Sequence, residues 1–124
     1  MATDRIENAQ AGRYAAEKKP FLSHNKTLMG DWESGTLYVV HSYGRHFPIY
    51  IYDKSVDMWF ANTNTASSTT SRHKTHAFPS GLPHHDITWL GLDDMHKIIR
   101  AGSYAGYVGK RICDAQPAPV GLAP

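Results

Sequence analysis

The sequence has a single cysteine, Cys113, and no hydrophobic run close to the ~18 residues that a membrane-spanning helix needs. A lone cysteine excludes a disulfide within the chain and is compatible with a reducing compartment. The first residues, MATDRIENAQAGRY, contain acids and no apolar stretch, so we expect no secretory signal peptide. These absences predict a cytoplasmic protein with no membrane partner.

The sequence also lacks the common catalytic and cofactor-binding motifs. It has no Cys-x-x-Cys or His-Glu-x-x-His pattern for zinc, no Gly-x-Ser-x-Gly nucleophile turn, no paired carboxylates and no Rossmann or Walker pattern. We therefore expect no cofactor, and the sequence favours a non-catalytic protein over an enzyme.

Charge of either sign is modest. Lysine and arginine number 13 and the acids 11, which gives a net charge of +2 and an isoelectric point of 8.7. The positive sign excludes an acidic mimic of DNA, whereas a domain built around phosphate contacts usually has a denser basic face. Eight histidines add positive charge only below about pH 6.5. Net charge at neutral pH therefore does not choose between protein and nucleic-acid partners.

Length and composition predict one globular domain with its own core, since the chain has 124 residues, 41% of them hydrophobic and 19% charged. The segments Thr36–Tyr43, Phe47–Asp53 and Asp57–Asn62 are rich in β-branched and aromatic residues, and short connectors join them. They predict a three-stranded antiparallel meander, the sheet core, over residues 36–62. Pro48 cannot donate to a ladder, so it should lie at a strand start or an edge.

Two segments have helical patterns. Residues 4–19 form the weaker one, because their apolar stripe is thin. Residues 93–101 form the stronger one, with Ile98 and Ile99 on a buried stripe that should cover the apolar face of the sheet. Gly102 can adopt the left-handed conformation that ends such a helix.

The remaining segments complete the predicted fold. Residues 21–35 mix turn residues with large apolar side chains and indicate irregular structure. Residues 86–90 and 103–109 are short strand candidates, and residues 113–124 should form an extended Pro/Ala-rich tail. The predicted class is α+β, a small antiparallel β-sheet of three to five strands flanked by two or three helices, in a single domain over residues 1–112.

The chain between residues 28 and 76 carries a series of short motifs. They are Ser-Tyr-Gly at 42–44, His-Phe-Pro at 46–48, Tyr-Asp at 52–53, Trp-x-x-Asn at 59–62 and Thr-Thr-Ser-Arg-His at 69–73. This pattern resembles a small uncharacterised domain found in phage and plasmid accessory proteins. The resemblance implies a mobile-element origin and a cytoplasmic setting in a host cell, but no reaction or ligand. Residues 65–67, Thr-Ala-Ser, depart from the Lys-Tyr-Ser that the family often has there, so a contact made by that lysine and tyrosine would be missing.

The hydroxyl-rich run ASSTTSRHKTH, residues 66–76, has two interpretations. Thr70 or Ser71 can cap a short helix that begins at Arg72, with Asp53 or Asp57 as carboxylates near the helix start. Alternatively, the run binds an anion or nucleic acid. The lack of glycine in the run favours the cap, because a phosphate loop needs close backbone approach. The candidate anion-binding residues are Thr69, Thr70, Ser71, Arg72, His73, Lys74 and Arg45.

The histidines suggest two further sites. His73, His76, His84 and His85 supply enough ligands for zinc, although no zinc motif supports them and a metal-free protein is favoured. The other set is His41, His46 and His73, which with Arg45 or Arg72 could serve a metal-independent nuclease or phosphodiesterase if they converge.

The tyrosines suggest a binding surface. In an alternating strand, Tyr50 and Tyr52 point to one face and Ile49 and Ile51 to the other, so one sheet face should be tyrosine-rich. We predict that Tyr50, Tyr52 and the nearby Tyr43 bind a partner.

The favoured hypothesis is therefore a non-catalytic accessory protein that binds a host or defence protein or nucleic acid, and that could form a homo-oligomer. The alternative is the histidine-based nuclease.

Two tryptophans, Trp59 and Trp89, are expected in the core.

Overall fold

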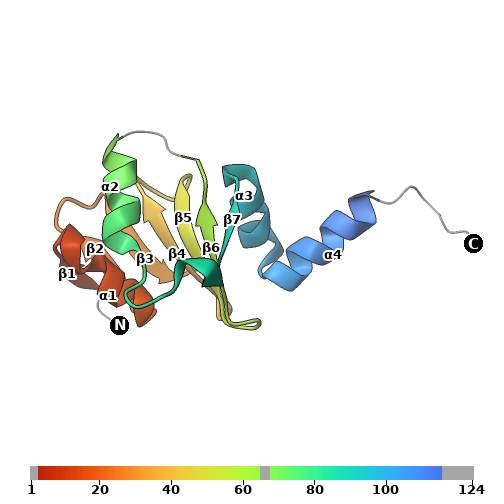
Figure 1. Cartoon of the computed structure of the whole chain (residues 1–124), viewed down its shortest axis with the longest axis horizontal. Helices are drawn as coiled ribbons and strands as arrows, with labels where there is room; N and C mark the ends of the chain where they lie inside the picture. The colour runs from red at the N-terminus through yellow and green to blue at the C-terminus, as the bar shows by residue number, and fades with distance from the viewer. Residues whose placement is uncertain (1–2, 65–67, 116–124) are drawn as a thin grey trace, which may run out of the picture.

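The structure, a computed structural model, describes residues 3–64 and 68–115, apart from the side chains of Ser68, His84 and residues 110–115. The sheet lies between α1 and α2 on one face and α3 with the start of α4 on the other (Figure 1). The strands are β1 (Asp4–Ile6), β2 (Phe21–Ser23), β3 (Leu28–Trp32), β4 (Leu37–Ser42), β5 (Pro48–Asp53), β6 (Met58–Asn62) and β7 (Ile87–Leu90). The helices are α1 (Ala11–Ala16), α2 (Ser68–Ala77), α3 (Leu92–Ala101) and α4 (Tyr104–Ala115), with short 3-10 helices η1 (Asn8–Gln10) and η2 (His84–Asp86).

The described strands form one sheet in chain order from β1 to β7. Strands β3 to β6 pair antiparallel, which confirms the predicted meander over β4, β5 and β6. The outer pairs β1–β2 and β6–β7 are parallel, and α2 lies in the connection from β6 to β7. The α+β class agrees with the prediction, but the described sheet has seven strands rather than three to five.

Strands β2 and β3 lie in the segment 21–35 that the turn-rich composition marked as irregular. Phe21 and Leu28 are buried on the same sheet face, and Gly30 makes room for the Phe21 ring. A Cβ on Gly30 would lie 2.5 Å from the Phe21 ring and 2.6 Å from the Tyr38 hydroxyl. The glycine that suggested a turn is therefore an adaptation to close packing within a strand.

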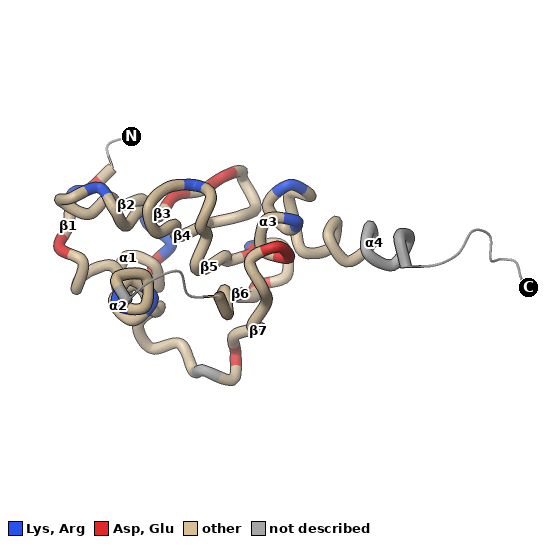
Figure 2. Tube along the Cα trace, turned by 90° about the horizontal axis from the view of Figure 1, so that it is seen from above, with Lys and Arg blue, Asp and Glu red and all other residues tan. Residues whose placement is uncertain are grey.

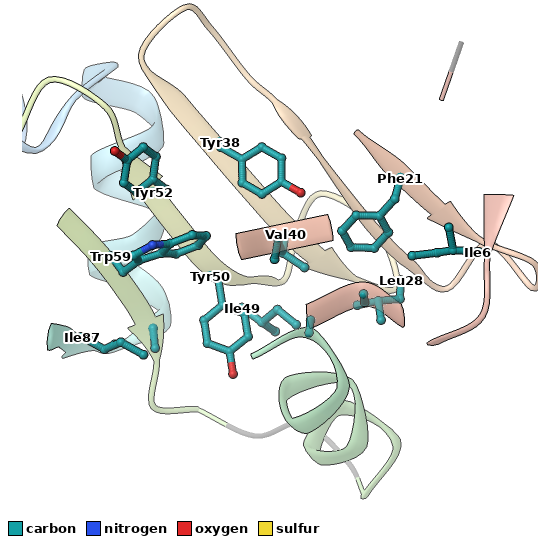
Figure 3. Packing of buried hydrophobic residues seen from close by; sticks show 14 residues of the cluster. Ile6, Phe21, Leu28, Tyr38, Val40, Ile49, Tyr50, Tyr52, Trp59 and Ile87 are labelled. Atoms are coloured by element: carbon teal, nitrogen blue, oxygen red, sulfur yellow. The ribbon is translucent and has the colours of Figure 1, made fainter. Parts of the chain in front are cut away.

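The face under α1 and α2 buries a cluster rich in aromatic side chains (Figure 3). The helices contribute Ala11, Ala15 and Ala77, whose small side chains let the helix backbones approach the sheet closely. The strands contribute the large side chains Ile6, Phe21, Leu28, Tyr38, Val40, Ile49, Tyr50, Tyr52, Trp59 and Ile87. Burial of apolar surface, worth about 25 cal/mol per Å², holds these layers together.

The opposite face packs against α3 and the first turns of α4. Met95 and Ile98 of α3 are fully buried against strand residues that include Val39, Ile51 and Phe60. The predicted cover of the apolar face by the helix that carries Ile98 is therefore confirmed.

The ends of α3 follow the prediction closely. The helix begins at Leu92, whose N–H donates to Asn64 Oδ1 at 2.8 Å. It ends at Gly102, which adopts the predicted left-handed conformation with φ 82° and donates its N–H to the carbonyl of Ile98. Ile99 is only partly buried, so the buried stripe is narrower than expected.

A register shift between β4 and β5 changes which side chains share a face. Val40 pairs with Tyr50 and His41 pairs with Pro48, so Ile49 has no partner opposite and forms a bulge. Ile49 consequently packs in the same cluster as Tyr50, and the predicted placement of Ile49 beside Ile51 is wrong. Pro48 starts β5, as predicted.

The amino-terminal segment is not the predicted helix over residues 4–19. Residues 4–6 form β1 beside β2, because this pairing buries Ile6 to 2% exposure. The Glu7 and Gln10 side chains then cap η1, and only residues 11–16 form α1. The apolar stripe was too thin to hold a long helix against strand pairing.

The carboxyl-terminal segment also differs from the prediction. Residues 103–109 were expected to form a strand, but Tyr104 begins α4. Its N–H donates to Asp53 Oδ2 at 2.6 Å, so a carboxylate from β5 supports the helix start. Residues 113–115 belong to α4, so an extended tail does not begin at 113, and residues 116–124 lie outside the described part.

Helices α1 and α2 touch where Gly12 meets the end of α2. A Cβ on Gly12 would lie 2.5 Å from the Phe78 carbonyl oxygen and 3.0 Å from that of His76, and the Gly12 carbonyl accepts the Ser80 N–H at 3.0 Å. Backbone atoms cannot move aside as a flexible side chain can, so only glycine fits without separating the helices.

We predict that Gly12→Ala lowers the free energy of unfolding by about 1–3 kcal/mol, because the added methyl group overpacks this contact. Urea denaturation measures the change. The matched control is Gly35→Ala, since a Cβ on Gly35 would meet nothing within 4 Å. Equal stability of the Gly12→Ala variant and the parent protein would contradict the contact.

Candidate functional site

Helix α2 begins earlier than the sequence suggested. Its first residue is Ser68, so Thr70 and Ser71 lie inside the helix, and the predicted cap at either residue is wrong. Thr70 and His73 are each 2% exposed and, with the buried Ala77, form the stripe that faces the sheet. Packing of this stripe outweighs the preference of hydroxyl side chains for caps. Residues 65–67, directly before Ser68, lie outside the described part.

The stripe is fixed to the sheet by a hydrogen bond between Ser42 Oγ and His73 Nδ1, 2.7 Å apart. Ser42 ends β4 and points to the α1/α2 face, and it is 1% exposed. Burial, and then the charge on His76, lower the pKa of His73, so its imidazole is neutral at pH 7. This bond joins the Ser-Tyr-Gly motif to the Thr-Thr-Ser-Arg-His motif.

The other motif residues are also linked to one another. The buried Asn62 amide donates to the Pro48 carbonyl at 2.9 Å, and its oxygen accepts the Asn64 N–H at 2.8 Å. Asn62 therefore holds the Trp-x-x-Asn strand against the start of β5. These contacts give the motifs a structural role and need no ligand.

Tyr43 projects from the end of β4 beside His73. Its backbone adopts the left-handed conformation with φ 58°, which is uncommon for a tyrosine, and its N–H donates to the Thr27 carbonyl at 2.7 Å. Its ring centroid lies 5.4 Å from that of His73 at an interplanar angle of 35°. The side chain is nevertheless 49% exposed. Tyr43 therefore presents an aromatic ring that the backbone and His73 hold in place.

The outer face of α2 is basic and rich in hydroxyls. Ser71, Arg72 and Thr75 are exposed, and the sequence has no acid between Asp57 and Asp86. Figure 2 accordingly shows blue but no red along α2. Within the described residues, the Arg72 guanidinium has no ion-pair or hydrogen-bond partner.

The other predicted anion ligands are engaged or buried. Arg45 pairs with Glu33, which neutralises it. Lys74 is half-buried, its ammonium contacts the Asn64 carbonyl, and burial lowers its pKa. Thr69 is only partly exposed, and His73 faces the sheet. Of the seven predicted residues, Ser71 and Arg72 remain: both are exposed on α2 and directly precede His73, whose ring packs against Tyr43.

The tyrosine-rich face predicted for partner binding is the core itself. Tyr50 is 2% exposed because α2 covers it, and Tyr52 is 8% exposed with Lys18, which follows α1, over its ring. The Tyr50 hydroxyl donates to the Lys74 carbonyl at 2.6 Å. Trp59 is buried as expected, whereas Trp89 is 47% exposed on β7, where the described sheet ends.

The histidines of the nuclease hypothesis come together only in part, because His73 is separated from the other two. His41 and Ser42 are neighbours in β4 and therefore point to opposite faces, so His73 lies on the α1/α2 face and His41 on the other. His41 lies near Arg45, His46 and His96, whose positive charges add to burial in lowering its pKa to about 4. Its Nδ1 is buried without a hydrogen-bond partner among the described residues.

The remaining predicted ligands are also dispersed. No group of three or more histidine, cysteine or acidic residues able to hold a metal occurs in the described part of the chain. His85 pairs with Asp86 at 3.5 Å, and the side chain of His84 is not described. Asp53 supports the start of α4 and Asp57 accepts the Tyr52 hydroxyl, so these two carboxylates have other partners than the start of α2.

Comparisons of the chain with family models, with curated proteins and with solved structures return no match. The described residues contain no helix of the length and apolar character that a membrane crossing requires. The candidate site therefore rests on its own geometry: Tyr43 is held against His73, and the exposed Ser71 and Arg72 directly precede His73 in α2. Sequence reasoning missed Ser42, and only its place in the Ser-Tyr-Gly motif could have indicated its importance.

We predict that stability falls as the pH drops, because His41 is neutral when folded and protonates when unfolded. With a folded pKa of about 4 against an ordinary value of 6.5, its contribution is complete above about pH 6.5 and is lost progressively toward pH 4. The loss from His41 is about 3 kcal/mol. Urea denaturation between about pH 7 and about pH 4.5 measures it.

The matched variants are His41→Met and His85→Gln. The first removes the buried His41 imidazole and should make the pH dependence shallower, leaving the part that His73 contributes, whereas the second removes an exposed imidazole and should leave the pH dependence unchanged. A His41→Met protein with the parent's pH dependence would show that another group titrates.

Proposed function

We propose that the protein is a non-catalytic binding module that holds single-stranded nucleic acid on the outer face of α2. The surface consists of Tyr43, Ser71, Arg72 and Thr75, called the α2 surface below. The observation that carries the proposal is an exposed aromatic ring held against His73, which directly follows an exposed arginine without a partner among the described residues.

The chemistry of the α2 surface suits a strand of unpaired nucleotides. An unpaired base can stack on an exposed tyrosine, and this contact is worth about 1–3 kcal/mol. A guanidinium binds phosphate through paired hydrogen bonds, and hydroxyls add weaker ones. The sequence has no acid between Asp57 and Asp86, so acids of this segment do not repel a phosphate backbone.

The surface also sets a limit on affinity. One unpaired arginine, together with the exposed Arg13 of the neighbouring α1, supplies about two phosphate contacts. Two contacts on a single strand correspond to a salt slope near −1.4 in a plot of log K against log salt. The expected binding is weak, weakly selective in sequence, and strongest at low salt.

The wider role follows the resemblance of residues 28–76 to phage and plasmid accessory proteins. We propose that the chain is a mobile-element accessory protein that acts in a host cell by this binding. The nuclease alternative is less favoured, because His73 lies on the opposite sheet face from His41, which is buried near His46 and Arg45.

Fluorescence anisotropy with a labelled mixed-sequence oligonucleotide tests the proposal at low and increasing salt. We expect Tyr43→Ala to weaken binding to the single strand about fivefold or more, because it removes the stacking ring. Arg72→Gln should weaken binding and make the salt slope shallower by about 0.7, because it removes one phosphate contact.

The matched control is Arg100→Gln, which removes an exposed arginine of α3 on the other side of the sheet and should bind like the parent protein. A duplex of the same sequence should bind less tightly, because its bases cannot stack on Tyr43. No binding at low salt, or an equal loss in Arg72→Gln and Arg100→Gln, contradicts the α2 surface and points to a protein partner.

A further inference from the structure

Lys18, which follows the end of α1, has an unusual backbone conformation. Its backbone is in the left-handed conformation with φ 54°, at a helix end where glycine is usual. The Lys18 N–H donates to Ala15 and the Lys19 N–H to Tyr14, both at 2.9 Å. These two bonds form the helix-ending pattern that normally selects glycine, so a side chain here carries a backbone cost that needs an explanation.

The side chain of Lys18 lies over two aromatic rings of the sheet. Its ammonium is 4.4 Å from the Tyr52 ring centroid and 6.0 Å from that of Trp59. The two rings are a cross-strand pair, 5.2 Å apart, and Tyr38 lies next to Trp59 at 6.4 Å (Figure 3). Aromatic faces attract cations through their quadrupole, and grouped faces of this kind recognise quaternary ammonium groups.

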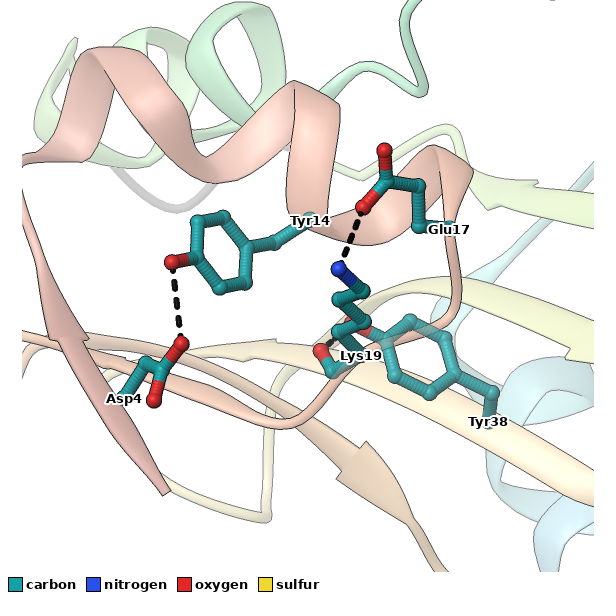
Figure 4. Close-up of polar contacts among 5 residues, drawn as sticks. All are labelled: Asp4, Tyr14, Glu17, Lys19 and Tyr38. Atoms are coloured by element: carbon teal, nitrogen blue, oxygen red, sulfur yellow. Dashed lines mark hydrogen bonds and ion pairs between the residues drawn. The ribbon is translucent and has the colours of Figure 1, made fainter. Parts of the chain in front are cut away.

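The nearby acids are engaged elsewhere. Glu17 pairs with Lys19 at 2.9 Å (Figure 4), and Asp57 accepts the Tyr52 hydroxyl at 2.5 Å. Within the described residues, no ion pair holds the Lys18 ammonium. The carboxylate of Asp57 at the rim of the Tyr52 ring still makes this position favourable for a cation.

The backbone around Lys18 is anchored independently of its side chain. The Trp32 indole donates to the Lys18 carbonyl at 3.1 Å, and the Tyr38 hydroxyl donates to the Lys19 carbonyl at 2.7 Å (Figure 4). The half-exposed side chain can therefore leave the rings while the end of α1 stays in place.

We propose that Tyr52 and Trp59 form a binding site for organic ammonium ions, and that Lys18 fills this site from within the chain. The ligand class is a quaternary or N-methylated ammonium, such as a methylated lysine side chain. Such a group is more weakly hydrated than the Lys18 ammonium, so it loses less hydration free energy when it moves from water to the ring faces. Lys18 thus acts as an internal competitor, which lowers the affinity of the site for an added ammonium ion but does not prevent its binding.

Titration with tetramethylammonium chloride, followed by tryptophan fluorescence, tests the site. A Trp89→Phe background removes the exposed tryptophan, so the signal reports on Trp59 and Trp32. We expect a saturable change in the parent protein and about two- to fivefold tighter binding in Lys18→Gly, the factor that an exposed cation–π contact represents. Sodium chloride at the same ionic strength should give no saturable change.

The matched control is Lys19→Ala, which removes the neighbouring ammonium and should bind as the parent does. A thermal unfolding scan of each variant confirms that it is folded. Equal affinity in the parent and Lys18→Gly proteins overturns the proposal, since the ion would then bind elsewhere. The absence of saturable binding in folded Lys18→Gly overturns it as well. Neither result bears on the α2 surface, which shares no residue with this site.

Discussion

The hydrogen bond between Ser42 and His73 is the contact on which the arrangement around α2 depends. Both side chains are almost completely buried, and their bonded atoms are 2.7 Å apart. A buried polar group that loses its partner costs about 1–3 kcal/mol, so an arrangement in which strand end and helix do not meet is disfavoured by that amount. The bond fixes which face of α2 turns inward. It thereby determines that Arg72 turns outward and that Tyr43 rests against the His73 ring.

Successive side chains of β4 point to opposite faces of the sheet, and this alternation limits which histidines can act together. Because Ser42 points to α2, its neighbour His41 points to the other face, where burial and the charges of Arg45, His46 and His96 keep it neutral. A pair of histidines that shared one phosphate would need to lie on one face. The constraint that builds the α2 surface therefore also separates His73 from His41 and from the Arg45 and His46 that lie near His41.

The segments predictable from sequence are those whose structure is set locally. The meander over β4 to β6 and helix α3 follow from alternation, apolar spacing and Gly102, all within short windows. The segments that were missed depend on partners far along the chain. Residues 4–6 become a strand only because β2 lies beside them, and α4 begins where Asp53, 51 residues earlier, accepts an N–H.

The candidate site was predictable in part for the same reason. The hydroxyl-rich run and Tyr43 were identified as candidates, but alternation alone could not reveal that Tyr50 and Tyr52 are buried, the first by α2 and the second under Lys18. A bulge at Ile49 shifts its side chain to the other sheet face, and the residue types around this position do not indicate a bulge. The partnership of Ser42 with His73 spans 31 residues, which no local spacing rule covers.

A double-mutant cycle between Ser42→Ala and His73→Leu tests the central role of this bond most directly. Free energies of unfolding for the parent, both single variants and the double variant give the coupling energy between the two side chains. The account predicts a favourable coupling of about 1 kcal/mol or more, with the double variant less destabilised than the sum of the single ones. Additive losses, with no coupling, would contradict the claim that this hydrogen bond holds α2 on the sheet.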